Sequence, residues 1–74
     1  MSKPTRITNS IRALRFARGE MTQAELAQRI GVTRQTVMAI EQGRYSPSLE
    51  VAFQIARVLK VPLDEVFQYP EGGS

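Results

Sequence analysis

One segment, residues 22 to 43, constrains the fold of this chain more than any other, because it carries signals that start and stop two short helices in close succession. Thr22 and Glu25 form a T-x-x-E capping box, which predicts a helix from about residue 23 to residue 30. Gly31 is expected to end this helix, because glycine adopts the left-handed backbone conformation that other residues resist. The chain must therefore turn sharply at this point.

A second short helix is predicted directly after the turn. Thr33 caps it and Gly43 ends it. Two helices that cross through a turn of three or four residues need a small side chain where they touch, and Ala27 meets that need. Val37 and Ile40 are three residues apart and form the buried stripe of this helix after the turn, which is the third along the chain. The pattern predicts a pair of crossed helices.

Three further helices are predicted around this pair. The first follows a cap at Thr8 or Asn9 and leads to Gly19, the fourth runs from Ser48 to about Lys60, and the fifth is short and begins near Pro62. The residues expected to face the core from the first and fourth helices are Ile11, Leu14, Phe16, Leu49, Ala52, Phe53, Ala56 and Leu59. Because no strand-like alternation occurs, the predicted fold class is all-α with five short helices.

The outer face of the third predicted helix carries side chains suited to reading base edges. Arg34 matches the two hydrogen-bond acceptors of guanine, and Gln35 matches the acceptor and donor pair of adenine. Met38 and Ala39 follow one turn later, where apolar groups can touch thymine methyl groups. A helix made only for packing would not need this arrangement, so the face is interpreted as a DNA-reading surface.

The stretch "TQAELAQRIGVTRQTVMAIEQGRYSPSLEVAFQIARVLKVPLDEVF" closely resembles the Cro/phage-repressor (xenobiotic-response-element) family of helix-turn-helix proteins, in its small stand-alone prokaryotic form. The resemblance implies a lambda-repressor-like DNA-binding domain of five helices over residues 9–68, with the helix-turn-helix unit at residues 23–42. Residues 1–8 are then expected to be a flexible basic arm, and residues 69–74 a disordered tail.

The resemblance also implies roles for individual residues. Base contacts are expected from Arg34, Gln35, Thr36, Met38 and Ala39. Phosphate contacts are expected from Thr22, Gln23, Thr33, Arg44, Tyr45 and Ser46. Arg15 and Glu41 match a partly buried structural ion pair. Met38 and Ala39 depart from the family pattern, because many relatives carry polar side chains there.

Composition narrows the function further. The chain has no Cys and no His, which excludes disulfides and thiolate metal sites and removes the commonest general base. Residues 1–44 carry eight Lys and Arg against three Glu, a net charge of +5, whereas residues 45–74 carry a net charge of −2. This asymmetry favours a polyanionic partner for the first part of the chain. Neither an enzyme, a metal site, a cofactor nor a small-molecule ligand is expected.

No apolar run is long enough to span a membrane and no signal peptide is evident, so a cytoplasmic location is expected. The fourth predicted helix carries a second apolar stripe, Val51, Ile55 and Val58, which widens its apolar arc to roughly 200°. Either the fifth helix covers this stripe through Leu63, Val66 and Phe67, or the stripe belongs to a homodimer. The residues expected at a two-fold dimer interface are Val58, Val66, Phe67 and Tyr69.

The sequence therefore predicts a transcriptional regulator that binds double-stranded DNA sequence-specifically. As a dimer, it would set two third helices in successive major grooves of an inverted-repeat operator, about 34–36 Å apart, and repress by occluding polymerase. The alternative is an antitoxin-like or other protein-interaction module with the same fold. The wide apolar arc and the apolar pair Met38 and Ala39 support this alternative.

Overall fold

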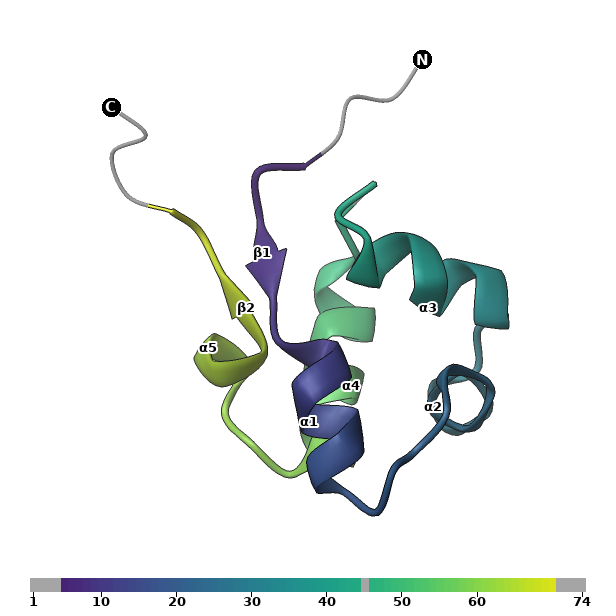
Figure 1. Cartoon of the computed structure of the whole chain (residues 1–74). Helices are drawn as coiled ribbons and strands as arrows, with labels where there is room; N and C mark the ends of the chain where they lie inside the picture. Colours follow the sequence, from purple (N-terminus) through teal and green to yellow (C-terminus); the bar gives the residue numbers. More distant parts are fainter. Residues whose placement is uncertain (1–4, 45, 71–74) are drawn as a thin grey trace.

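The computed structural model describes residues 5–44 and 46–70, and it contains five helices and one small antiparallel ladder (Figure 1). In chain order the elements are β1 (Thr8–Asn9), α1 (Ile11–Ala17), α2 (Gln23–Ile30), α3 (Arg34–Glu41), α4 (Leu49–Leu59), α5 (Leu63–Val66) and β2 (Phe67–Gln68). The number, order and approximate positions of the helices match the sequence prediction. Within the described ranges, no helix has the length and apolar character needed to cross a bilayer.

Helix α2 begins and ends as the sequence predicts. The Oγ1 of Thr22 accepts a hydrogen bond from the backbone N–H of Glu25 at 3.0 Å, and Gly31 closes the helix with φ 75°. Only this half of the capping box is formed, since the Glu25 carboxylate instead pairs with Arg29 at 3.2 Å. The cap and the glycine fix the direction in which the chain enters α3.

Helix α3 ends in a Schellman motif that depends on the left-handed conformation of Gly43. The N–H of Gly43 donates to the carbonyl of Ile40 at 3.0 Å, and the N–H of Arg44 donates to the carbonyl of Ala39 at 3.0 Å. These two bonds satisfy carbonyls that the helix end would leave free. They also hold Arg44 directly against the end of α3.

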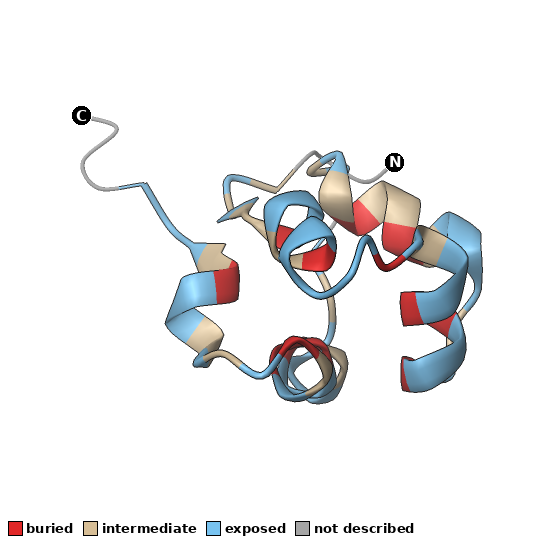
Figure 2. Cartoon of the chain, turned by 60° about the horizontal axis from the view of Figure 1, so that its bottom comes forward, coloured by how far each residue is buried: buried red, intermediate tan, exposed pale blue. Residues whose placement is uncertain are grey.

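The core lies between the helices, on the sides that face one another (Figure 2). Ala27 is buried, and Val37 and Ile40 are buried with it, as the crossed-helix pattern requires. The buried apolar residues that form one cluster are Ile11, Met21, Leu26, Ala27, Ile30, Val37, Ile40, Ile55, Ala56, Leu59 and Val66.

Three residues that the sequence analysis assigned to the core are exposed instead. Phe16 is 51% exposed, Leu49 is 70% exposed and Phe53 is 55% exposed. On α4 the buried stripe runs through Ala52, Ile55, Ala56 and Leu59, and thus lies to one side of the predicted one. The apolar arc of α4 is wider than its buried face, and the packing of its neighbours decides which part of the arc is covered.

The ladder between β1 and β2 was not predicted, because strands of two residues carry no periodic signal. Thr8 pairs with Gln68 and Asn9 pairs with Phe67 in an antiparallel register. Next to the ladder, the N–H of Ser10 donates to the carbonyl of Val66 at 2.9 Å. The sequence predicts an arm over residues 1–8. In the structure the chain is hydrogen-bonded to the end of α5 and to β2 from Thr8 onwards.

The start of α1 also differs from the prediction. Ser10 is the N-cap residue and its side chain makes no capping bond, whereas Thr8 and Asn9 lie in β1. Asn9 still serves the helix, since its Oδ1 accepts a hydrogen bond from the N–H of Ile11 at 3.1 Å.

Candidate nucleic-acid interface

The first turn of α3 presents polar side chains to solvent. Arg34 and Gln35 are exposed, while Met38 and Ala39, one turn later, are half-buried. On the opposite side of the helix, Val37 and Ile40 are the residues that α3 buries in the core. One face of α3 is therefore anchored in the core. The other face is exposed to solvent in the first turn, where Arg34 and Gln35 lie.

Two threonines organise the entrance to α3. The Oγ1 of Thr33 accepts a hydrogen bond from the N–H of Thr36 at 3.1 Å, which confirms its capping function. The two hydroxyl groups also lie 3.0 Å apart, within hydrogen-bonding distance of each other. Because its hydroxyl is already engaged and its side chain is half-buried, Thr36 is less available to a ligand than Arg34 or Gln35.

An ion pair joins α1 to α3 beneath this surface. The Nε of Arg15 lies 2.7 Å from Oε2 of Glu41, and its Nη2 donates to Oε1 of the same carboxylate at 3.2 Å. A third donor comes from α2, since Nε2 of Gln23 lies 3.2 Å from Oε1 of Glu41. The Arg15 guanidinium also donates to the carbonyl of Met21 at 2.7 Å. The carboxylate of Glu41 thus connects all three helices, and its bidentate pairing with Arg15 fixes the orientation of the two side chains.

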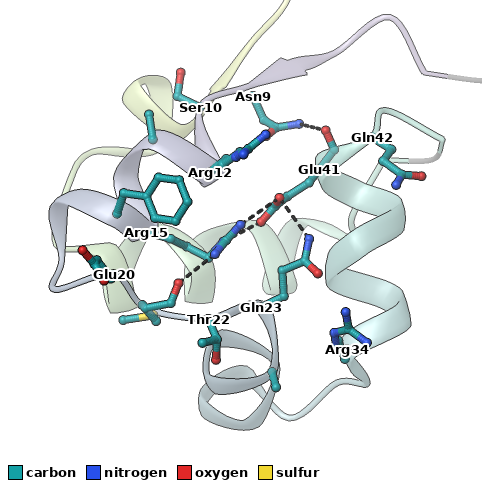
Figure 3. Close-up of a pocket in the computed structure, with 14 residues that line it drawn as sticks. Asn9, Ser10, Arg12, Arg15, Glu20, Thr22, Gln23, Arg34, Glu41 and Gln42 are labelled. Atoms are coloured by element: carbon teal, nitrogen blue, oxygen red, sulfur yellow. Dashed lines mark hydrogen bonds and ion pairs between the residues drawn. The ribbon is translucent and has the colours of Figure 1, made fainter.

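Asn9 supplies a second brace that the sequence analysis missed. Its Nδ2 donates to the carbonyl of Ile40 at 3.0 Å and to the carbonyl of Glu41 at 3.3 Å, and so holds the last turn of α3. Figure 3 shows the bond from Asn9 to Glu41. The same side chain bonds the start of α1 through its Oδ1. No local pattern points to this role, because Asn9 and its partners are more than 30 residues apart in the chain.

An open cleft of about 1090 Å³ lies between α1, the start of α2 and α3. Figure 3 shows the polar side chains that line it: Arg12 comes from α1, Gln23 from α2 and Arg34 from α3, and Gln42 is the C-cap residue of α3. The residues that line the cleft are Asn9, Ser10, Arg12, Ala13, Arg15, Phe16, Glu20, Met21, Thr22, Gln23, Ala24, Arg34, Glu41 and Gln42.

The charge that the cleft offers to a ligand is positive. Arg15 and Glu41 neutralise each other, and the only other ion pair among the described residues joins Glu25 and Arg29 outside the cleft. This leaves the cleft with the guanidinium groups of Arg12 and Arg34 and the carboxylate of Glu20, a net charge of +1. A phosphate group would find both cationic and amide donors here.

Arg12 is a candidate site residue that the sequence analysis did not select. Its guanidinium lies 5.6 Å from the centroid of the Phe16 ring, and the guanidinium of Arg15 lies 5.5 Å from the same centroid. Such cation–π contacts restrict the orientation of a long side chain at an exposed site. The i, i+3, i+4 spacing of Arg12, Arg15 and Phe16 places them on one face of the helix, and this spacing is the sequence pattern that indicates Arg12 as a site residue.

The remaining predicted phosphate-contacting residues flank the two helices. Thr22 and Thr33 are exposed at the starts of α2 and α3, and Arg44 and Ser46 are exposed after α3. Tyr45 lies outside the described residues. Apart from Ser46 and Tyr45, these residues belong to the segment of +5 net charge.

The structure separates the residues predicted for a dimer interface. Val66 is 0% exposed, so its assignment to an interface is wrong: its side chain is part of the core. Phe67 is half-buried and Tyr69 is 65% exposed, both beside α5. Val58 is half-buried on α4, but it lies about 180° around that helix from Leu49. Because Val66 is buried, the four residues cannot all belong to one interface.

Among residues 5–44 and 46–70, no three carboxylate, His or Cys side chains come close enough to hold a metal ion. Of the two carboxylates that line the cleft, Glu41 is held by Arg15, and only Glu20 has no ion-pair partner among the described residues. The geometry is that of a binding surface with charged and amide donors.

Comparison with known proteins agrees with this geometry. A helix-turn-helix family model matches residues 11–66. An uncharacterized HTH-type transcriptional regulator of Methanothermobacter thermautotrophicus is 53% identical over 55 residues, which are 73% of this chain and 80% of that protein. The cryptic phage CTXphi transcriptional repressor RstR of Vibrio cholerae is 39% identical over 59 residues, which are 80% of this chain and 52% of the repressor.

A solved structure shows the same fold. The crystal structure of the hypothetical transcription factor NHTF from Neisseria superposes with a TM-score of 0.70 and 30% sequence identity, covering 82% of this chain and 69% of that one.

Proposed function

The chain belongs to the helix-turn-helix family of DNA-binding transcriptional regulators, and from this premise we propose that it reads a specific duplex sequence through the first turn of α3. The observation that carries the proposal is the exposure of Arg34 and Gln35 on a helix whose other face is anchored in the core. Members of this family bind double-stranded DNA and are not enzymes.

Base recognition is assigned to α3. Arg34 and Gln35 can each form paired hydrogen bonds with a purine edge in the major groove, and each good pair contributes about 1–3 kcal/mol of discrimination. Met38 and Ala39 offer apolar contacts to thymine methyl groups, and Thr36 adds a hydroxyl near the helix start. Because Thr36 already bonds Thr33, most of the hydrogen-bond specificity is assigned to Arg34 and Gln35.

Phosphate contacts are assigned to both ends of the unit. The start of α2 offers free backbone N–H groups beside Thr22 and Gln23, where the helix dipole favours an anion. Thr33, Arg44 and Ser46 are exposed at the ends of α3 and are assigned to the backbone as well. Tyr45 keeps the same assignment from the family resemblance. These contacts position the domain without carrying sequence information.

We assign the working form to a homodimer, which represses transcription from an inverted-repeat operator by occluding polymerase. Two copies of α3 would then occupy successive major grooves about 34–36 Å apart. DNA carrying both half-sites would favour the dimer by mass action if self-association is weak. Such a regulator works in the cytoplasm, and its DNA-binding domain is assigned to residues 9–68.

Selection of bound sites from a random pool of duplex DNA tests the proposal. We expect an enriched inverted repeat with half-site centres about one helical turn apart. Binding should also weaken strongly between 50 and 200 mM salt, because phosphate contacts release counterions. If no sequence is enriched and affinity stays at the nonspecific level, the alternative of an antitoxin-like protein-interaction module replaces the DNA-reading function.

A further inference from the structure

Helix α4 carries an exposed face that the domain core does not use. Leu49 is 70% exposed and Phe53 is 55% exposed, although both are large and apolar. At 100° per residue, Leu49, Phe53, Arg57 and Glu50 lie within an arc of about 100° on this helix. We refer to these four residues as the α4 face.

A shallow apolar groove continues from the α4 face. It has a volume of about 200 Å³ and is lined by Ile7, Pro47, Leu49, Ala52, Leu63 and Phe67. Tyr69, which is 65% exposed, follows Phe67 in the chain. Exposed apolar surface with a polar rim is typical of protein–protein interfaces.

The charges on the α4 face are complementary to a second copy of the same face. Glu50 precedes Phe53 by three residues and Arg57 follows it by four. If two α4 helices pack antiparallel about Phe53, Glu50 of one copy lies alongside Arg57 of the other. A two-fold axis generates this pair twice. Within the described part of the chain, the two ion pairs involve neither Glu50 nor Arg57, so both are available.

We propose that the α4 face is the homodimer interface: two chains pack their α4 helices antiparallel, with Phe53 at the two-fold axis and Glu50–Arg57 pairs on either side. The inference rests on the proposed function, which calls for a dimer, and it replaces the interface predicted from the sequence. Val58 is excluded because it lies on the other side of α4, and Val66 because it is buried.

The α4 face leaves the cleft beside α3 free. The groove beside α4 and the cleft beside α3 share no lining residue. Helix α5 and β2 border the groove, whereas α1, α2 and α3 border the cleft. A partner bound at the groove would therefore leave Arg12, Gln23 and Arg34 of the cleft uncovered.

A charge swap tests the interface. Glu50→Arg and Arg57→Glu each put like charges together twice, so each should raise the dimer dissociation constant at least about tenfold in sedimentation equilibrium. The double variant Glu50→Arg/Arg57→Glu restores opposite charges and should dimerise about as well as the original chain. Arg18→Glu is the matched control: Arg18 is the exposed C-cap residue of α1, belongs to neither the α4 face nor the groove, and undergoes the same charge change as Arg57→Glu.

The outcomes separate the interface from the function. Recovery in the double variant, with no effect of Arg18→Glu, supports the α4 face. If both single variants dimerise normally and still bind an inverted repeat as dimers, the α4 face is wrong while the proposed function stands. If the unmodified chain stays monomeric both alone and on operator DNA, the dimeric form itself is wrong and the inference falls with it.

Discussion

The Nε of Arg15 donates to Oε2 of Glu41 at 2.7 Å, and the two side chains are only 7% and 9% exposed. This pair links α1 to the last turn of α3. We expect Glu41→Ala to lower the free energy of unfolding by about 3–5 kcal/mol, because it leaves the Arg15 guanidinium buried without its partner. Thermal or urea unfolding followed by circular dichroism measures this change. DNA binding will be lost as a consequence of unfolding.

A double variant distinguishes lost pairing from lost packing. Arg15→Met combined with Glu41→Leu removes both charges and should recover most of the stability that Glu41→Ala loses. The exposed pair of Glu25 and Arg29 provides a control, and Glu25→Ala should cost less than about 1 kcal/mol. Equal losses for Glu41→Ala and Glu25→Ala would contradict the brace.

Gln35→Ala is expected to relax the base preference of the protein at one position of each half-site. The loss should be about 1–3 kcal/mol of discrimination against the wrong base, with the unfolding temperature unchanged because Gln35 is exposed. Arg44→Ala is the comparison, since loss of a phosphate contact should weaken binding to all sequences about equally. An unaltered site preference in Gln35→Ala would remove Gln35 from the reading surface.

Arg12→Ala tests whether α1 takes part in binding the DNA backbone. Arg12 lines the same cleft as Gln23 and Arg34, so we expect it to meet a phosphate. Removing one such contact should reduce the slope of log affinity against log salt by about 0.9, for specific and nonspecific DNA alike. Arg18→Ala removes the same charge outside the cleft and should leave the slope in place. Identical slopes for both variants would exclude Arg12.

Lys60→Gly should stabilise the fold. Lys60 ends α4 with φ 60°, in the left-handed region where a residue with a Cβ is strained. Relief of this strain is expected to raise stability by about 1 kcal/mol, which is about 4–8 °C in Tm for a domain of this size. Gly31→Ala makes the reverse change at φ 75° and should lower Tm, although its new Cβ would meet no atom within 4 Å. A Tm that moves in the same direction for both would contradict this account.

Local signals predicted the parts of this molecule that local interactions determine. Thr22, Gly31, Thr33 and Gly43 start and stop α2 and α3 through bonds to residues near them in the chain, and the structure has each of these ends where the sequence indicated it. The Arg15–Glu41 ion pair was predicted only from the resemblance to a known family. The roles of the exposed residues on α3 stay predictions, because no ligand is present.

Contacts between distant segments could not be predicted from the sequence. The apolar arc of α4 was recognised, but which part of it is buried depends on where α5 and β2 pack, so Phe53 was assigned to the wrong side. Asn9 had a visible helix-capping role, yet its bonds to Ile40 and Glu41 come from a chain crossing that no periodicity encodes. Both errors concern tertiary packing and not secondary structure.

The ladder of β1 and β2 has a consequence for how the domain opens. Its paired residues, Thr8 and Gln68, are 60 positions apart, and closing a loop of that length costs roughly 3–4 kcal/mol of chain entropy. A ladder of two residues can repay this only after the helices have packed, so we expect it to form last in folding and to exchange its amide hydrogens first. Ile7 and Phe67 line the groove beside α4, one from each side of the ladder. Opening of the ladder would separate Ile7 from Phe67 and so disrupt the groove. A partner bound in the groove would therefore slow the opening.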